Sequence, residues 1–144
     1  MVEIRGLDAV RKIVENTTNV SAYNALLYNI ANVVLTTIQT KTAAGFDYLN
    51  GKFQPYTEVY KKFKIKRGYS GDVNLRLSGQ MMDNLKVITR DNQVIIGFDD
   101  AVAEKKARYN QTGRVPRHFV GIGPDLDKQI TKMIDEFVNK LMGM

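Results

Sequence analysis

The chain has 144 residues, of which 44% are hydrophobic and 25% are charged, and this composition is typical of one globular domain. It contains no cysteine, which excludes disulfides, cysteine nucleophiles and cysteine metal sites. No apolar run approaches the roughly 20 residues that cross a membrane, and the charged first residues lack the apolar core of a signal peptide. We therefore expect a single domain over residues 1–144, synthesised in a cytoplasm, with no membrane partner.

The net charge of +6 is concentrated in one segment. Residues 52–70 hold six basic residues and one acidic residue, whereas residues 1–51 sum to zero and residues 71–144 to +1. We expect a basic arm that carries Lys61, Lys62, Lys64, Lys66 and Arg67. Such a segment indicates contact with a polyanion or with an acidic protein face. A solvated arm with a positive bias gives the same pattern, so both interpretations stay open.

The first part of the chain is predicted to be mostly helical. Alternation over Val2–Arg5 predicts a short strand, and apolar spacing over Leu7–Glu15 predicts a short helix. The strongest helical pattern runs from Val20 to Ala43 and contains no acidic residue. Its apolar stripe consists of Tyr23, Leu27, Ile30, Val34 and Ile38. We expect this helix to be buried within its own domain, or also against a neighbouring subunit.

Residues 45–72 are predicted to form an extended arm or loop. Asn50-Gly51 is a turn signal, and Tyr56–Lys64 predicts a short helix with Thr57 as its cap. Tyr56, Tyr60 and Phe63 share one face of that helix, with lysines between them. These rings could stack on nucleic-acid bases, or they could anchor the segment while the lysines extend into water.

The second half of the chain contains the strand signals. Leu77–Asn84 is predicted as a short helix or tight turn. Leu85–Arg90 and Gln93–Phe98 flank Asp91-Asn92 and predict a hairpin, with a loop of two residues or of three to five. Asp99-Asp100 precedes a helix predicted over Ala101–Tyr109, and His118–Ile122 is predicted as a third strand that pairs with the hairpin.

The last predicted helix begins at Pro124, a residue suited to a first helical turn. Its apolar stripe consists of Leu126, Ile130, Met133, Phe137 and Leu141. Together these elements predict the α+β class: a small antiparallel sheet with two long amphipathic helices on one face, and an extended basic arm.

A bend over Tyr109–Ile122 is the strongest candidate for an interaction site. Gly113 can adopt a positive φ, and Pro116 fixes its own φ, so we expect a stiff corner that presents two arginines. With Lys105, Lys106 and Arg108 these arginines form a second basic concentration. The residues expected to contact a subunit or partner are Tyr109, Asn110, Gln111, Arg114, Arg117 and Phe119.

Catalytic and ligand motifs are lacking in the sequence. His118 is the only histidine and has no nucleophile motif beside it, and Asp99-Asp100 lacks the spacing of a calcium loop. Gly121-x-Gly123 does not match a dinucleotide fingerprint. We predict no catalytic, metal-binding or cofactor-binding residues, and no enzyme activity.

Five short motifs follow one another over residues 53–141. They are Pro55–Lys61, Leu77–Met81, a hairpin that ends in Ile96-Gly97, Lys106–Gly113 and Pro116–Ile122, before a final amphipathic helix. This order resembles the phage virion morphogenesis family, the tail-completion proteins of tailed bacteriophages. The first fifty residues match that family only as a short strand and helix followed by a long helix.

The resemblance implies a structural virion protein at the neck or tail end, which completes the tail or joins it to the head. It implies a homo-oligomeric ring, commonly six- or twelve-fold, with neighbouring neck, connector or tail-tube proteins as partners. Non-specific contact with packaged DNA is a further expectation. The alternative, from charge alone, is a small basic nucleic-acid-binding module.

Overall fold

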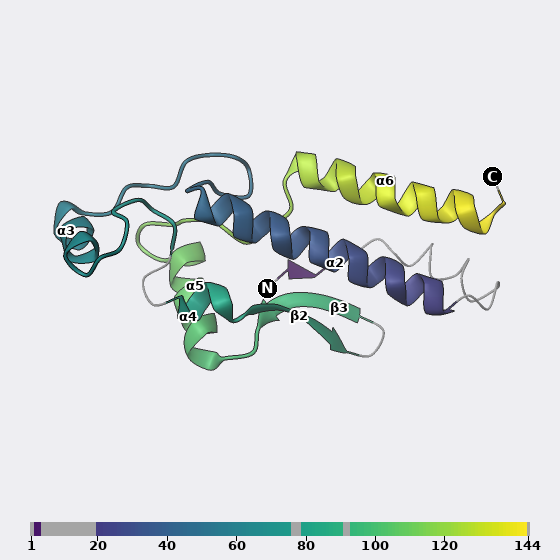
Figure 1. Cartoon of the computed structure of the whole chain (residues 1–144), viewed down its shortest axis with the longest axis horizontal. Coiled ribbons are helices and arrows are strands. Elements are labelled where there is room, and N and C mark those ends of the chain that lie inside the picture. The colour runs from purple at the N-terminus through teal and green to yellow at the C-terminus, as the bar shows by residue number, and fades with distance from the viewer. Residues whose placement is uncertain (1, 4–19, 76–78, 91–92, 144) are drawn as a thin grey trace.

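The computed structural model describes residues 2–3, 20–75, 79–90 and 93–143, and Figure 1 shows it. The helix predicted over Leu7–Glu15 lies outside these residues. The described elements in chain order are β1 (Val2–Glu3), α2 (Val20–Ala43), α3 (Glu58–Lys66), α4 (Gln80–Asp83), β2 (Leu85–Arg90), β3 (Gln93–Phe98), α5 (Ala101–Thr112) and α6 (Pro124–Leu141). The fold is α+β, as predicted. Among the described helices, none is both long and apolar enough to cross a bilayer.

The sheet is antiparallel, with strand order β1-β3-β2. Strands β2 and β3 have the predicted bounds, and Arg90 pairs with Gln93, so the hairpin link is the shorter, two-residue alternative. The conformation of Asp91 and Asn92 lies outside the described residues. Val2 pairs with Ile96 and Glu3 with Ile95, which confirms the first two residues of the predicted amino-terminal strand and places them beside β3. The rest of that predicted strand lies outside the described residues.

The prediction of a third strand over His118–Ile122 was wrong. This segment is irregular, and β1 occupies the place beside β3 instead. The side chain of Gln111 satisfies the Val120 backbone: its Nε2 donates to the Val120 carbonyl at 3.2 Å, and its Oε1 accepts from the Val120 N–H at 3.2 Å. A side-chain amide thus makes the pair of bonds that a neighbouring strand would supply.

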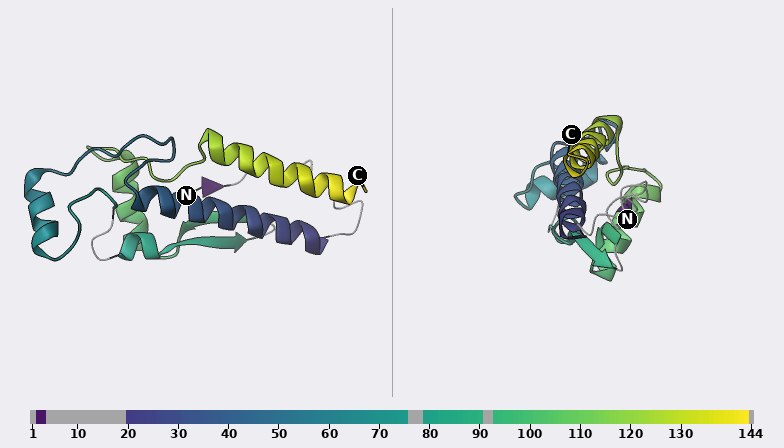
Figure 2. Two further views of the ribbon diagram at one scale, coloured as in Figure 1. Left: turned by 45° about the horizontal axis from the view of Figure 1, so that its top comes forward. Right: turned by 90° about the vertical axis from the view of Figure 1, so that its right-hand side faces the viewer.

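The two long helices lie in successive layers. Helix α2 packs on the sheet, and α6 packs mainly on α2, so that an end-on view shows α6, α2 and the hairpin in that order (Figure 2). Both helices lie on one side of the sheet, as predicted, but only α2 packs directly on the strands. The middle position of α2 explains why its apolar residues spread over much of its circumference, whereas α6 has one apolar stripe and one charged face.

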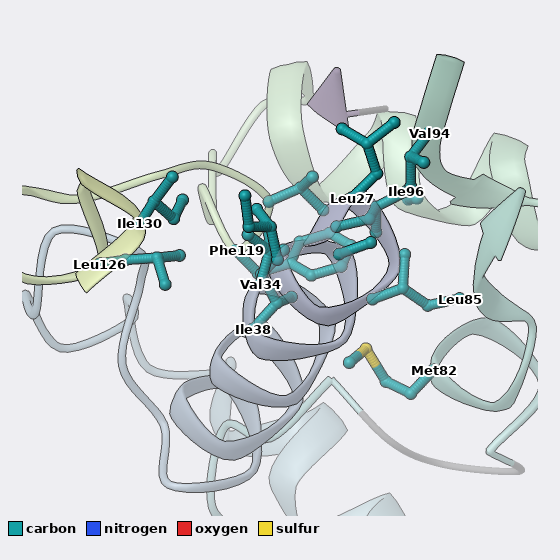
Figure 3. Close-up of a cluster of buried hydrophobic side chains, with 14 of the residues drawn as sticks. Leu27, Val34, Ile38, Met82, Leu85, Val94, Ile96, Phe119, Leu126 and Ile130 are labelled. Carbon is teal, nitrogen blue, oxygen red and sulfur yellow. The ribbon is translucent and has the colours of Figure 1, made fainter. Parts of the chain in front are cut away.

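The core lies between these layers, where the apolar side chains of α2, the hairpin and α6 meet (Figure 3). The predicted stripe of α2 is buried throughout. The core also contains both methionines of α4 and Phe119, which is 1% exposed. Each large side chain buried in this way contributes roughly 1.5–3 kcal/mol to folding.

A cap explains where α5 begins. The Asp100 carboxylate accepts from the Ala103 N–H at 2.9 Å and caps α5, which confirms the predicted start of that helix. Helix α5 extends three residues past its predicted end, to Thr112. Asp99 instead pairs with Lys86 of β2 at 2.8 Å, and this hydrogen bond is the main cause of the lowered pKa of Asp99.

Candidate functional site: the basic arm and its cleft

The arm (residues 45–72) begins with a tight turn fastened to the body. Phe46 and Lys52 pair across it, and the Asp47 carboxylate accepts from the N–H groups of Leu49 and Gly51. Asn50 has a φ of 69°, as the predicted turn requires. Phe53 then enters the core.

The same turn explains the two glycines near the end of the bend. The Tyr48 N–H donates to the His118 carbonyl at 3.1 Å, which brings the two segments together. A Cβ on Gly121 would lie 2.6 Å from the Tyr48 ring, and one on Gly123 would overlap the Tyr48 carbonyl oxygen. Gly121-x-Gly123 is therefore a packing requirement of this junction.

Helix α3 stands away from the layered body, at one end of the molecule (Figures 1 and 2). Its nine residues follow Thr57, whose hydroxyl accepts from the Tyr60 N–H at 3.3 Å, which confirms the predicted cap. The helix begins two residues later than the predicted range and ends at Lys66, two residues past it. The helix leaves large apolar side chains in solvent: Val59 is 81% exposed and Ile65 is 54% exposed. An isolated helix of this length is marginal in water, so the arm needs attachments to the rest of the chain.

Lys64 fastens α3 to the segment of chain that follows it. Sequence reasoning placed it with the exposed basic residues, yet its side chain is 0% exposed. Its Nζ donates to the Asn74 Oδ1 at 3.0 Å and to the Asp72 carbonyl at 3.3 Å. Burial lowers the pKa of Lys64, while the nearby Asp72 carboxylate acts in the opposite direction. The other four predicted arm residues, Lys61, Lys62, Lys66 and Arg67, are exposed.

Arg117 supplies a second attachment, from the bend. Its Nε donates to the Gln54 carbonyl at 3.0 Å, and its Nη2 donates to the Pro55 carbonyl at 3.2 Å. The Tyr56 ring has two cations near it, with Arg117 Cζ and Lys64 Nζ each 4.9 Å from its centroid. Burial raises the pKa of Tyr56. Arg117 thus fixes the base of α3 to the bend.

The other predicted contact residues lie at different depths. Tyr109 is 66% exposed and Arg114 is exposed, whereas Asn110 and Gln111 are half-buried. Asn110 accepts from the Arg117 backbone N–H through its carbonyl, which closes the bend. Phe119 is a core residue, so its predicted role as a surface contact is corrected: its side chain does not reach the surface.

Gly113 shapes the bend by lacking a side chain, not by an unusual φ. Its φ is −75° and its backbone is extended, in contrast to the predicted positive φ. A Cβ at this position would overlap the Tyr109 carbonyl oxygen, which accepts the Gly113 N–H at 2.9 Å. Close backbone contact at Gly113, and not a positive φ, therefore shapes the corner.

A cleft of about 520 Å³ separates the base of the arm from α4, the end of α5 and the bend. The arm and the bend were both predicted from the sequence. The cleft between them was not predicted, because these two segments are remote from each other in the sequence. Its lining includes Tyr56, Tyr60, Met81, Lys106, Tyr109, Val115 and Arg117. Lys106 Nζ donates to the Gln80 Oε1 at 2.6 Å, and this bond joins α5 to α4 beside the cleft.

The two walls of the cleft also carry the positive charge of the molecule. Residues 52–75 hold six basic and two acidic residues, and residues 101–117 hold five and one, which gives +4 for each segment. We call these two segments the basic end. They sum to +8, and because the whole chain has +6, the remaining residues sum to −2. The fold thus joins two separate basic segments into one positively charged end.

In the described part of the chain, no three His, Cys, Asp or Glu side chains gather as metal ligands. His118 is exposed, and its carbonyl is the group that makes a structural bond, to Tyr48. No family model, no curated protein and no solved structure matches this chain. The resemblance to the tail-completion proteins is therefore supported by the order of the sequence motifs alone.

Proposed function

We propose that this chain is a structural virion protein of a tailed bacteriophage, and that several copies form a ring at the neck or tail end. The observation that supports this most is the arm. A lone subunit leaves Val59, Ile65 and Phe63 in water on a helix that stands away from the body. Covering such an apolar surface with a second molecule lowers the free energy of the assembly.

The arrangement suits a ring because the two ends of the subunit differ. The arm and the basic end lie at one extremity, whereas the carboxyl-terminal part of α6 lies at the other (Figure 1). Unlike surfaces that meet head to tail generate a closed ring when the rotation between copies closes. Through this ring the protein would complete the tail or join it to the head, as the motif order suggests.

The experiment compares the mass in solution of the wild-type protein with that of two variants. Val59→Asp places a charge on the exposed face of α3, and Val102→Asp makes the same change on the first turn of α5, where Val102 is 51% exposed. Sedimentation should find a ring-sized wild-type species, a monomeric Val59→Asp variant and a ring-sized Val102→Asp variant. Monomers of wild type at every concentration would count against the proposal.

The nucleic-acid-binding alternative is favoured by one observation, the concentration of +8 at the basic end. It predicts that the isolated subunit binds duplex DNA and that the affinity falls steeply with salt. A titration of labelled duplex at two salt concentrations separates the alternatives, because the structural role requires no such affinity in the monomer.

A further inference from the structure

The cleft beside the arm has the size and the lining of a binding site. Its volume of about 520 Å³ lies within the usual range of ligand pockets. Met81, Tyr109 and Val115 all line the cleft. Met81 is buried, whereas Tyr109 and Val115 are exposed. A molecule that enters would contact apolar groups on both the body and the arm.

The described lining of the cleft contains two cations and no carboxylate. Lys106 donates to a neutral amide oxygen, and Arg117 donates to two backbone carbonyls. In the part of the chain that the structure describes, neither cation forms an ion pair. A guanidinium has five N–H donors in a planar fork, and the two carbonyls leave part of that fork for a ligand. An anion here would therefore add charge-assisted bonds without displacing the attachment of the arm.

The aromatic rings are arranged for protein contacts more than for base stacking. The Tyr56 and Tyr60 rings meet edge to face at 4.8 Å, and the Tyr60 ring stacks on Phe63 at 6.0 Å. Arg67 lies over the Phe63 ring at 4.4 Å, and two cations lie near Tyr56. Base stacking needs open ring faces, and each of these three rings already has another ring or a cation beside it. The apolar lining instead suits an aliphatic or aromatic side chain.

We propose that this cleft binds a segment of a partner protein in which a carboxylate side chain lies next to an apolar one. The carboxylate contacts Lys106 and Arg117, and the apolar side chain packs between Tyr109, Val115 and Met81. This site goes beyond the proposed ring, because it concerns a different surface from the exposed face of α3.

The test titrates the isotope-labelled full chain with three probes and follows the resonances of the cleft residues. The probes are a capped tripeptide with one aspartate between two leucines, the same peptide with asparagine, and a short oligothymidylate. We expect the aspartate peptide to shift the Val115 and Met81 methyl signals and the Arg117 Nε–H signal. We expect it to bind at least about tenfold more tightly than the asparagine peptide, the difference that a charge-assisted bond supplies.

Two variants locate the site without disturbing the arm. Lys106→Gln removes a cation from the cleft and should weaken the aspartate peptide about tenfold. Lys105→Gln is the matched control, because Lys105 is exposed on the same helix and does not line the cleft. Equal affinity for the two peptides, tighter binding of oligothymidylate in the cleft, or no cleft shift at about 10 mM peptide would each overturn the proposal. Peptide binding that is retained in Val59→Asp, whether or not that variant forms rings, would support the cleft site independently of the ring.

Discussion

At the scale of single residues, the arm depends on a lysine that a pattern of charges cannot distinguish from its neighbours. Lys61, Lys62, Lys64 and Lys66 read as one solvated run, which is the usual meaning of such a run. Only the fold back to residues 72–74 gives one of them two oxygen acceptors and a place out of water. The distinction lies in a tertiary contact, so the sequence contains no signal for it.

Lys64→Ala should loosen the arm. The change removes the buried stem and both hydrogen bonds, and such a loss costs about 1–3 kcal/mol. Because α3 makes few other contacts, the effect should be local and should appear as faster hydrogen exchange of the α3 amides with little change in the sheet. Lys62→Ala is the control, since Lys62 is exposed and has neither bond. Equal exchange rates in the two variants would contradict a structural role for Lys64.

The lowered pKa of Lys64 makes a prediction about pH. Below its ordinary value of 10.5, the folded state gives up the Lys64 proton before the unfolded state does. The unfolded state then binds more protons, so the free energy of unfolding rises with pH in that window. Lys64→Met keeps the stem and removes the titration.

Urea unfolding of both proteins should show wild type gaining stability relative to Lys64→Met as the pH rises towards 10.0. The upper limit avoids the titration of Tyr56, whose pKa is raised from 10.0 and which acts in the opposite direction. If the difference in free energy of unfolding between the two proteins does not change with pH, or changes in favour of Lys64→Met, the result would contradict a buried, titrating Lys64.

At the scale of elements, the sequence predicted those helix and strand boundaries that depend on local interactions. The bounds of α2, β2 and β3 followed from periodicity, and the start of α5 followed from Asp100. The prediction of a third strand was wrong for a non-local reason. His118–Ile122 has the apolar character of a strand, but strand formation needs a partner edge, and β1 had taken the one beside β3. Gln111 replaced that partner from a neighbouring helix.

Gln111→Ala should therefore destabilise the protein. Both backbone groups of buried Val120 lose their bonds, and an unsatisfied buried group costs about 1–3 kcal/mol. Thermal unfolding measures the effect, with Gln129→Ala as the control, because Gln129 lies exposed on α6. Melting temperatures that match in the two variants would mean that Val120 finds other partners.

At the scale of the whole molecule, the structure has three layers and one projecting arm (Figure 2). The sequence predicted two amphipathic helices and a sheet but could not say that α6 covers α2, because an apolar stripe does not identify what it packs against. The same holds for the basic end. Two charged segments separated by more than twenty residues were each visible, yet the cleft between them depends on how the chain folds.

In the proposed ring, the exposed face of α3 joins one copy of this chain to the next. Negative-stain electron microscopy of the purified protein near physiological salt tests it most directly, with Val59→Asp examined beside wild type. We expect closed rings of one size for wild type and isolated subunits for the variant. Rings of equal size and number in Val59→Asp, or isolated subunits in both samples, would contradict it.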